Sequence, residues 1–387
     1  MFSRRIPPHL EPNALARALA AIRASGAAVA DLTDSNPTRA DIPYPIDLLA
    51  PLAEAAALRY DPHPFGLPAA RAAVAADCAR RGVAVDPAQV VLTASTSEAY
   101  SWLFKLLCDA GDSVLVPRPS YPLFEHLTAL DGVHVQPYDL QYHGRWSIDM
   151  TALVAAPERT RAVLLVSPNN PTGSFVSAEE LAALVRLCRE RRWPLIVDEV
   201  FADYPLEAPD PLTDVAARSD VLTFSLAGLS KTVGLPQLKL AWIVVGGPAA
   251  ARDVALAALE LVADSYLSVA TPVQLAAGHL LRAGRGVRAA IQRRIRENLA
   301  ALRAAARDVP ACEVLRTDGG WSAVVRVPAT RREEAMVLDL LERERILVHP
   351  GYFFDFPREA YVVVSLLPPP ALFADACARM LRVMGGA

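Results

Sequence analysis

Short runs made wholly of apolar residues recur along this chain from about residue 44 onward, and they constrain its fold more than any other feature. They lack the alternation of apolar and polar residues that a half-exposed strand shows, so each run is typical of a strand buried on both faces. Longer segments with helical periodicity separate them. This pattern predicts an α/β protein whose mainly parallel sheet is flanked by helices. The runs are Val90–Thr93, Ser113–Val116, Ala162–Val166, Leu195–Val197, Val221–Ser225 and Leu240–Val245.

The chain has 387 residues, more than one hydrophobic core usually serves, which predicts two domains. We expect residues 1–43 to form an N-terminal arm that also contributes to the smaller domain. Residues 44–275 would form the large domain and residues 276–387 the small one. The arm should contain a short helix from Asn13 to about Ser25, followed by an irregular, proline-rich segment.

A long helical region from about Ala249 to Arg307 should form the crossing into the small domain. Its glycines, Gly278, Gly284 and Gly286, predict interruptions at those positions. Beyond it, the sequence predicts an α+β unit in which strands surround a helix over Arg332–Glu342. The expected strands are EVLRT, SAVVRV, ILVHP and AYVVVSL, and a terminal helix should begin near Ala371.

Composition excludes several classes of protein. No apolar run reaches the roughly 18 residues that a membrane helix needs, and no apolar segment follows the first arginines as in a secretory signal. A net charge of −3 with both signs interspersed argues against binding to nucleic acid or a membrane surface. Five widely spaced cysteines and no ligand-spaced histidines predict free thiols and no metal site. We therefore expect a soluble, cytoplasmic protein.

One lysine stands where chemistry is expected. Lys231 follows the apolar strand Val221–Ser225 after a few small, flexible residues, which would place it at the mouth of the sheet. Most lysines are solvated surface charges, so this position alone decides nothing. Four other segments precede it in order: the turn Ser95-Thr96-Ser97, Tyr121 after a Pro-Ser pair, the string SPNNPTG at residues 167–173, and Asp198-Glu199 after a buried strand.

In this order and spacing, the five segments resemble the pyridoxal-phosphate (PLP) enzymes of aminotransferase class I/II, fold type I. The resemblance spans Leu32 to Leu367, nearly the whole chain. It implies a large PLP-binding domain, a smaller α+β domain and a homodimer. It also implies that Lys231 forms a Schiff base with the cofactor aldehyde and then moves a proton at the substrate's α-carbon.

Asp198 would pair with the protonated pyridine nitrogen of the cofactor. A carboxylate after a wholly apolar strand is costly when unpaired, and a pyridinium would relieve that cost. The alternative is a capping aspartate at a strand end. Asn170 matches the family asparagine that binds the ring oxygen, but asparagine before proline is also common in turns. Tyr121 matches the aromatic residue that stacks on the ring, or it is an ordinary core tyrosine.

The turn Ser95-Thr96-Ser97 would bind the cofactor phosphate, because N–H groups at a helix N-terminus favour anions. An ordinary helix cap formed by Ser95 with Glu98 is compatible with that role. The resemblance adds Ser230 and Lys239 as further phosphate anchors, although arginine is usual at the second of these positions. It also implies that Tyr60 reaches the phosphate of the neighbouring subunit, so that the active site lies at a dimer interface.

Two positions depart from the family pattern. Phe201 stands where a tyrosine usually shares the cofactor's ring oxygen, and its lack of a hydroxyl should raise the pKa of the Schiff base. Val363 stands where an arginine usually clamps the substrate's α-carboxylate. Either the substrate has no α-carboxylate, or another cation binds it. Arg39 is the first candidate, with Ser35 and Asn36 beside it in the segment that covers the site; Arg358 is another, or a surface charge.

We therefore expect a PLP-dependent aminotransferase that moves an amino group between a small amine or amino-acid donor and a keto or aldehyde acceptor. A PLP-dependent lyase, a decarboxylase or a specialised biosynthetic enzyme on the same fold is the alternative. These reactions differ in which bond at the α-carbon breaks, and the sequence does not show that. A regulatory or binding module without catalysis is a third possibility, against which Lys231, Asp198 and Asn170 argue.

Overall fold

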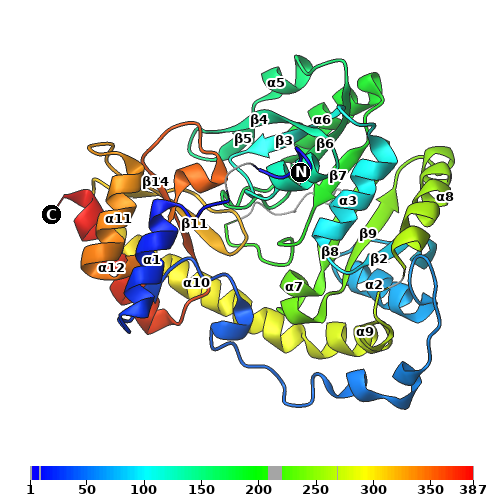
Figure 1. The fold of residues 1–387 in the computed structure, drawn as a ribbon, viewed down its shortest axis with the longest axis horizontal. Coiled ribbons are helices and arrows are strands. Elements are labelled where there is room, and N and C mark those ends of the chain that lie inside the picture. The colour runs from blue at the N-terminus through cyan, green and yellow to red at the C-terminus, as the bar shows by residue number, and fades with distance from the viewer. Residues whose placement is uncertain (1, 8–9, 208–219, 268, 387) are drawn as a thin grey trace.

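A computed structural model describes residues 2–7, 10–207, 220–267 and 269–386 of this chain. A large mixed sheet flanked by helices occupies one side of the molecule, and a smaller sheet with its own helices occupies the other (Figure 1). Within the described ranges, no helix is both long enough and apolar enough to cross a bilayer.

Eight strands form the central sheet: β2 (Val90–Thr93), β3 (Ser113–Arg118), β4 (His134–Tyr142), β5 (Trp146–Ile148), β6 (Thr160–Val166), β7 (Leu195–Asp198), β8 (Thr223–Gly228) and β9 (Ala241–Gly246). Their spatial order is β2-β9-β8-β7-β6-β3-β4-β5. Neighbours from β8 to β4 pair in parallel, whereas β9 is antiparallel to β8 and β2, and β5 is antiparallel to β4. The predicted mainly parallel sheet is confirmed.

Helices cover both faces of this sheet, which explains why its strands are apolar throughout. In β6, Val163 and Leu165 belong to a core cluster with α6, whereas Leu164 belongs to the opposite cluster with α3 and α8. Successive residues of a strand point to opposite faces, so both faces need apolar side chains here. The helices are α2 (Pro68–Arg80), α3 (Thr96–Leu107), α4 (Phe124–Leu130), α5 (Met150–Val154), α6 (Ala178–Arg191), α7 (Leu229–Thr232) and α8 (Ala249–Tyr266).

The smaller sheet is antiparallel, in the order β10-β11-β14-β13. Its strands are β10 (Glu313–Val314), β11 (Ser322–Arg326), β13 (His349–Pro350) and β14 (Tyr361–Ser365), and beside it β1 (Ala30–Asp31) pairs in parallel with β12 (Ile346–Leu347). The accompanying helices are α1 (Ala14–Ala24), α11 (Glu333–Glu344) and α12 (Pro370–Gly385). Because α1 packs against α11, the N-terminal segment lies with the small sheet (Figure 1).

Two further helices, α9 (Thr271–Ala283) and α10 (Arg285–Arg307), link the two parts, and α10 runs from α9 toward the small sheet (Figure 1). The predicted interruption at Gly284 is confirmed, but those at Gly278 and Gly286 are wrong. A glycine inside a helix costs only about 1 kcal/mol, so packing overrides it. At Gly278, an added Cβ would make only an ordinary contact of 3.6 Å with Ala73 Cβ of α2, so the packing of the two helices does not require this glycine. The helical region has one further interruption that was not predicted, because α8 ends at Tyr266 and α9 begins at Thr271.

The turn that follows β13 depends on a buried carboxylate. Glu333, 1% exposed, accepts hydrogen bonds from the backbone N–H groups of Gly351 (3.0 Å), Tyr352 (3.1 Å) and Tyr361 (2.9 Å). It thereby ties the start of α11 to the turn and to β14. The short 3₁₀ helices of the chain are Pro37–Arg39, Ala50–Ala53, Ala55–Leu58, Pro87–Gln89, Pro236–Leu238 and Gly351–Phe354.

Candidate active site

A cavity of about 370 Å³ opens at the carboxyl ends of β6, β7 and β8, where ligands of open α/β sheets usually bind. The small sheet supplies its other wall through residues of β11, β13 and β14. Of the site residues expected from the sequence, those that line the cavity are Ser35, Ser95, Thr96, Ser97, Tyr121, Asn170, Asp198, Ser230 and Lys231.

Asp198, the last residue of β7, is 7% exposed. Its Oδ2 accepts a hydrogen bond from the Tyr100 hydroxyl at 2.7 Å, and its Oδ1 accepts one from the backbone N–H of Val200 at 3.0 Å. Burial raises the pKa of the Asp198 carboxyl, while these two hydrogen bonds and the nearby Lys231 act in the opposite direction. A cationic partner would stabilise the ionised form further.

Lys231 lies on the one-turn helix α7, directly after β8. Its Nζ is 4.6 Å from the ring centroid of Trp321 and 5.3 Å from that of Phe201. Desolvation lowers the pKa of Lys231 to about 8, although attraction to Asp198 raises it. A larger share of this amine is therefore unprotonated near neutral pH than in an exposed lysine, as a nucleophile or general base requires.

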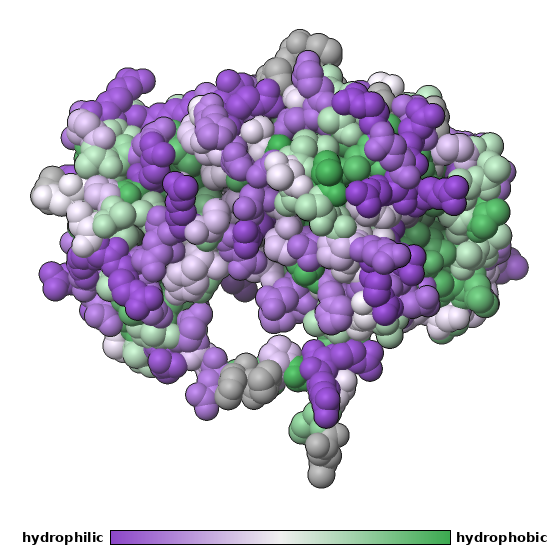
Figure 2. All heavy atoms as spheres, turned by 90° about the horizontal axis from the view of Figure 1, so that it is seen from above, coloured by the Kyte–Doolittle hydropathy of each residue, from purple (hydrophilic) through white to green (hydrophobic). Residues whose placement is uncertain are grey.

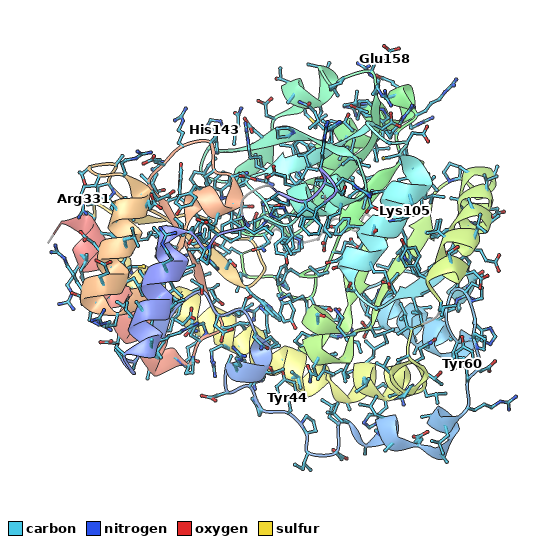
Figure 3. All side chains as sticks on the ribbon, viewed as in Figure 1. Tyr44, Tyr60, Lys105, His143, Glu158 and Arg331 are labelled. Atoms are coloured by element: carbon cyan, nitrogen blue, oxygen red, sulfur yellow. The ribbon has the colours of Figure 1, made fainter. Side chains whose placement is uncertain are left out.

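The whole sequence contains only three lysines, Lys105, Lys231 and Lys239. Lys105 lies on α3, where it forms an ion pair with Asp131, and Lys239 is exposed (Figure 3 labels Lys105). Neither lines the cavity. Lys231 is thus the one lysine of this chain that the structure brings to the cavity.

The backbone around Lys231 is held by two hydrogen bonds from other elements. The Tyr204 hydroxyl donates to the carbonyl of Lys231 at 2.6 Å, and Arg288 Nε of α10 donates to the carbonyl of Thr232 at 2.7 Å. Arg288 also lies 3.4 Å from Asp77 and 3.5 Å from Asp203. These contacts fix the position from which the lysine side chain enters the cavity.

The N-terminus of α3 forms a second wall. Ser95 is its N-cap, and Ser95 Oγ accepts a hydrogen bond from the backbone N–H of Glu98 at 3.1 Å. Thr96 and Ser97 occupy the first turn, and all three serine and threonine side chains line the cavity. An anion placed here would meet hydroxyl donors and the positive end of the helix dipole.

The two asparagines of SPNNPTG differ in their surroundings. Asn169 is 2% exposed and donates through Nδ2 to the Pro119 carbonyl at 3.0 Å and to Thr172 Oγ1 at 2.9 Å, so it holds the loop together. Asn170 lines the cavity, and its Oδ1 has a long contact of 3.4 Å with Ser322 Oγ. Asn170 is therefore the asparagine whose amide is placed to bind a ligand.

Four of the expected site residues do not line the cavity: Asn36, Arg39, Tyr60 and Lys239. Arg39 and Lys239 are exposed. Tyr60 is 67% exposed and lies near the periphery of the molecule (Figure 3). Its expected contact was with a neighbouring subunit, which a single chain does not test. The roles assigned to these four residues stay predictions.

The cavity also contains residues that the sequence analysis did not single out, among them Tyr100, Trp321, Ser322, His349 and Ser365. Tyr100 had a local signal, because it lies four residues after Thr96 and so shares its helix face. Ser322, His349 and Ser365 come from the small sheet, and Trp321 directly precedes its strand β11. No local pattern showed that this sheet faces the carboxyl ends of β6 to β8.

These residues fit PLP by the chemistry of their donors. Asp198 offers a buried carboxylate for a pyridinium, the α3 N-terminus offers donors for a phosphate, and Lys231 offers an amine for an aldehyde. Tyr121 and Phe201 supply aromatic walls. Over the described residues, no group of three or more histidine, cysteine or acidic side chains is placed to hold a metal ion.

Comparisons with known proteins agree with this geometry. The family model "Aminotransferase class I and II" matches residues 52–370. The alanine aminotransferase of Mycobacterium tuberculosis is 27% identical over 306 residues, covering 76% of this chain and 70% of that protein. The glutamate-pyruvate aminotransferase AlaA of Escherichia coli is 26% identical over 315 residues, covering 78% of this chain and 77% of that protein.

Solved structures share the fold. An alanine aminotransferase from Pyrococcus furiosus superimposes with a TM-score of 0.88 at 23% identity, with 96% of each chain covered. A mutant aspartate aminotransferase of Thermus thermophilus gives a TM-score of 0.86 at 24% identity, with 99% of each chain covered. The chain therefore belongs to the class I and II aminotransferase family, as a PLP-dependent aminotransferase with the fold type I architecture.

Proposed function

We propose that this aminotransferase works through Lys231, moving an amino group from a small amine or amino-acid donor to a keto or aldehyde acceptor. The observation that carries the proposal is the position of Lys231, which lines the cavity together with the buried carboxylate Asp198. The relatives described above are named as aminotransferases, which favours amino transfer over the lyase and decarboxylase alternatives.

When bound, PLP supplies an electron sink for the carbanion that forms at the donor's α-carbon. Lys231 Nζ would hold the cofactor aldehyde, and its amine, when free, would move the proton at the donor's α-carbon. Asp198 would keep the pyridine nitrogen protonated, because its buried carboxylate would stabilise the positive charge there. Phe201 and Trp321 keep bulk water away from the amine.

The lining of the cavity supports further cofactor contacts. Backbone N–H groups and hydroxyls at Ser95-Thr96-Ser97, with Ser230, would bind the phosphate, Asn170 would donate to the ring oxygen, and Tyr121 would stack on the ring. Lys239, which lies outside the lining, would have to add its positive charge from the adjoining segment. Of the substrate-binding candidates, Ser35 lines the cavity, while Asn36 and Arg39 would have to approach from the adjoining segment.

Mixing the PLP-loaded protein with a panel of donors and acceptors tests this function. We expect at least one pair, drawn from amino acids or amines and from keto acids or aldehydes, to exchange the amino group. Mass spectrometry would identify the aminated acceptor and the carbonyl product of the donor in equal amounts. Release of carbon dioxide or ammonia without amination of any acceptor would contradict the proposal and support the decarboxylase or lyase alternative.

We further propose that the protein is a cytoplasmic homodimer in which Tyr60 contacts the partner's cofactor phosphate. All five cysteines are free thiols, which fits a reducing compartment. Apolar side chains gather at the end of the molecule that carries α8, where Val254 and Leu261 are exposed (Figure 2). Ile46 and Leu58, in the segment 41–67, are also exposed. Exposed apolar side chains that gather on one surface are typical of an interface between proteins, which supports the proposed dimer.

Sedimentation equilibrium of the PLP-loaded protein tests the dimer. We expect a mass of two chains, and we expect Tyr60→Phe to weaken PLP binding about tenfold, because one hydrogen bond to a charged phosphate is lost. A fully active monomer, or an unchanged dissociation constant for PLP in Tyr60→Phe, would contradict the shared site.

A further inference from the structure

The wall that the small sheet contributes to the cavity has an unusual charge pattern. This small-sheet wall consists of Trp321, Ser322, His349, Val363 and Ser365. It contains hydroxyl, indole, imidazole and apolar groups but neither arginine nor lysine. Among the described residues that line the cavity, Lys231 is the only lysine and there is no arginine; Asp198 lines the same cavity. A carboxylate placed against the small-sheet wall would therefore meet no fixed positive charge.

Two polar groups of this wall lack a hydrogen-bond partner within the described residues: the indole N–H of Trp321, which is 1% exposed, and the half-buried imidazole of His349. His349 lies on β13, where its backbone pairs with that of Val363 on β14. Its ring packs against Phe353 and Phe354, with centroid distances of 5.8 and 5.6 Å. Across the described part of the chain, neither ring nitrogen makes a hydrogen bond to the protein. A half-buried imidazole without partners is free to bind a ligand in the cavity.

The surroundings of His349 favour the neutral ring. Burial lowers its pKa below the usual value, and the carboxylate of Asp31 acts in the opposite direction. That carboxylate is itself engaged, because it accepts hydrogen bonds from Thr33 and lies 3.3 Å from Arg23 Nη2. A neutral imidazole offers one donor and one acceptor, which suits an uncharged polar group better than a carboxylate.

We infer that His349 is a specificity-determining residue, and that it binds an uncharged hydrogen-bonding group of the amino donor, such as an amide or an alcohol. This inference rests on the proposed function, since it assumes that the donor amine reacts at Lys231. Val363, 1% exposed, adds an apolar surface beside the imidazole. A donor carboxylate would lose its hydration there without gaining a cation, which costs more than burying an amide or a hydroxyl that is hydrogen-bonded.

A matched series of donors tests the inference. L-alanine, L-alaninamide and L-alaninol share one skeleton and differ only in the group that would face His349. In single-turnover absorbance measurements on the PLP-loaded protein, we expect L-alaninamide or L-alaninol to bind about 10- to 100-fold more tightly than L-alanine. Calorimetry with propionamide and propionate, which have no amine, gives the same comparison without any reaction, and propionamide should bind more tightly.

Two substitutions test whether the preference for neutral donors depends on the His349 ring nitrogens. His349→Phe keeps a ring but loses both nitrogens, so the dissociation constants of L-alaninamide and L-alaninol should rise about tenfold or more, with little change in the rate constant at saturation. His349→Gln, which keeps a donor and an acceptor, should recover part of the loss. His143→Phe is the control, because His143 is exposed at the surface (Figure 3). The absorbance of lysine-linked PLP shows that each variant is folded.

The outcomes separate this inference from the proposed function. If L-alanine binds as tightly as L-alaninamide, or if both His349 variants bind the neutral donors as the parent does, the inference is wrong and amino transfer still stands. Arg39 would then be the first candidate for the carboxylate. If no donor alters the absorbance of bound PLP and no acceptor is aminated, the proposed function fails, and the inference fails with it.

Discussion

Lys231→Ala should lower turnover by at least about 10⁴-fold and abolish covalent attachment of PLP. The upper range for a single acid–base group is about 10⁴-fold, and this variant removes both the proton carrier and the amine that holds the cofactor. The side chain lines the cavity beside Asp198, and no other lysine of the chain does so. Absorbance spectra with added PLP and a steady-state assay would measure the two losses.

Lys105→Ala is the matched control, because Lys105 lies on α3 in an ion pair with Asp131 and does not line the cavity. It should keep the absorbance of lysine-linked PLP and most of the activity. A surface ion pair contributes about 1 kcal/mol or less, so stability should change little. Activity within tenfold of the parent protein in Lys231→Ala would contradict the role assigned to Lys231.

Asp198→Asn should lower the turnover number by about 10²- to 10³-fold while leaving the lysine-linked cofactor in place. The amide keeps the shape of the carboxylate but cannot stabilise a positive charge at the pyridine nitrogen, and the loss of one preorganised electrostatic contact typically costs that much. Asp198 is 7% exposed, so water does not replace the missing charge. An unchanged turnover number would show that Asp198 only caps the end of β7.

Tyr100→Phe removes the hydrogen bond that Asp198 accepts from Tyr100 but keeps the carboxylate, so it tests the effect of that hydrogen bond alone. The Tyr100 hydroxyl donates to Asp198 Oδ2 at 2.7 Å and thereby lowers the pKa of that carboxyl. Without the hydroxyl the pKa of Asp198 should rise, so the acid limb of the pH profile for kcat/KM should move to higher pH. Activity at the optimum should fall about tenfold or less. A shift of the acid limb to lower pH would contradict this assignment.

The central sheet was predictable because its strands obey one physical rule. Strands covered on both faces need apolar side chains at every position, and each of the six predicted runs overlaps one strand of that sheet. β4 and β5 were not predicted. In β4, which lies next to the edge strand β5, only Tyr138 and Leu140 are buried. Its polar residues gave no clear strand pattern.

The candidate site was predictable where residues stand at the carboxyl ends of the parallel strands. Asn170 and Lys231 follow β6 and β8, and Asp198 ends β7, so the parallel arrangement alone brings them to one edge. His349 and Trp321 could not be predicted in this way. Their positions depend on how the small sheet packs beside the central one, which is a tertiary arrangement without a local signature.

Borohydride reduction of the PLP-loaded protein, followed by peptide mapping, tests the central claim most directly. Reduction makes the bond between PLP and its lysine permanent, and the chain offers only Lys105, Lys231 and Lys239 as attachment points. We predict one phosphopyridoxyl group per chain, on the peptide that contains Lys231. Label on Lys105 or Lys239 instead, or no label at saturating PLP, would contradict the claim that Lys231 is the catalytic lysine.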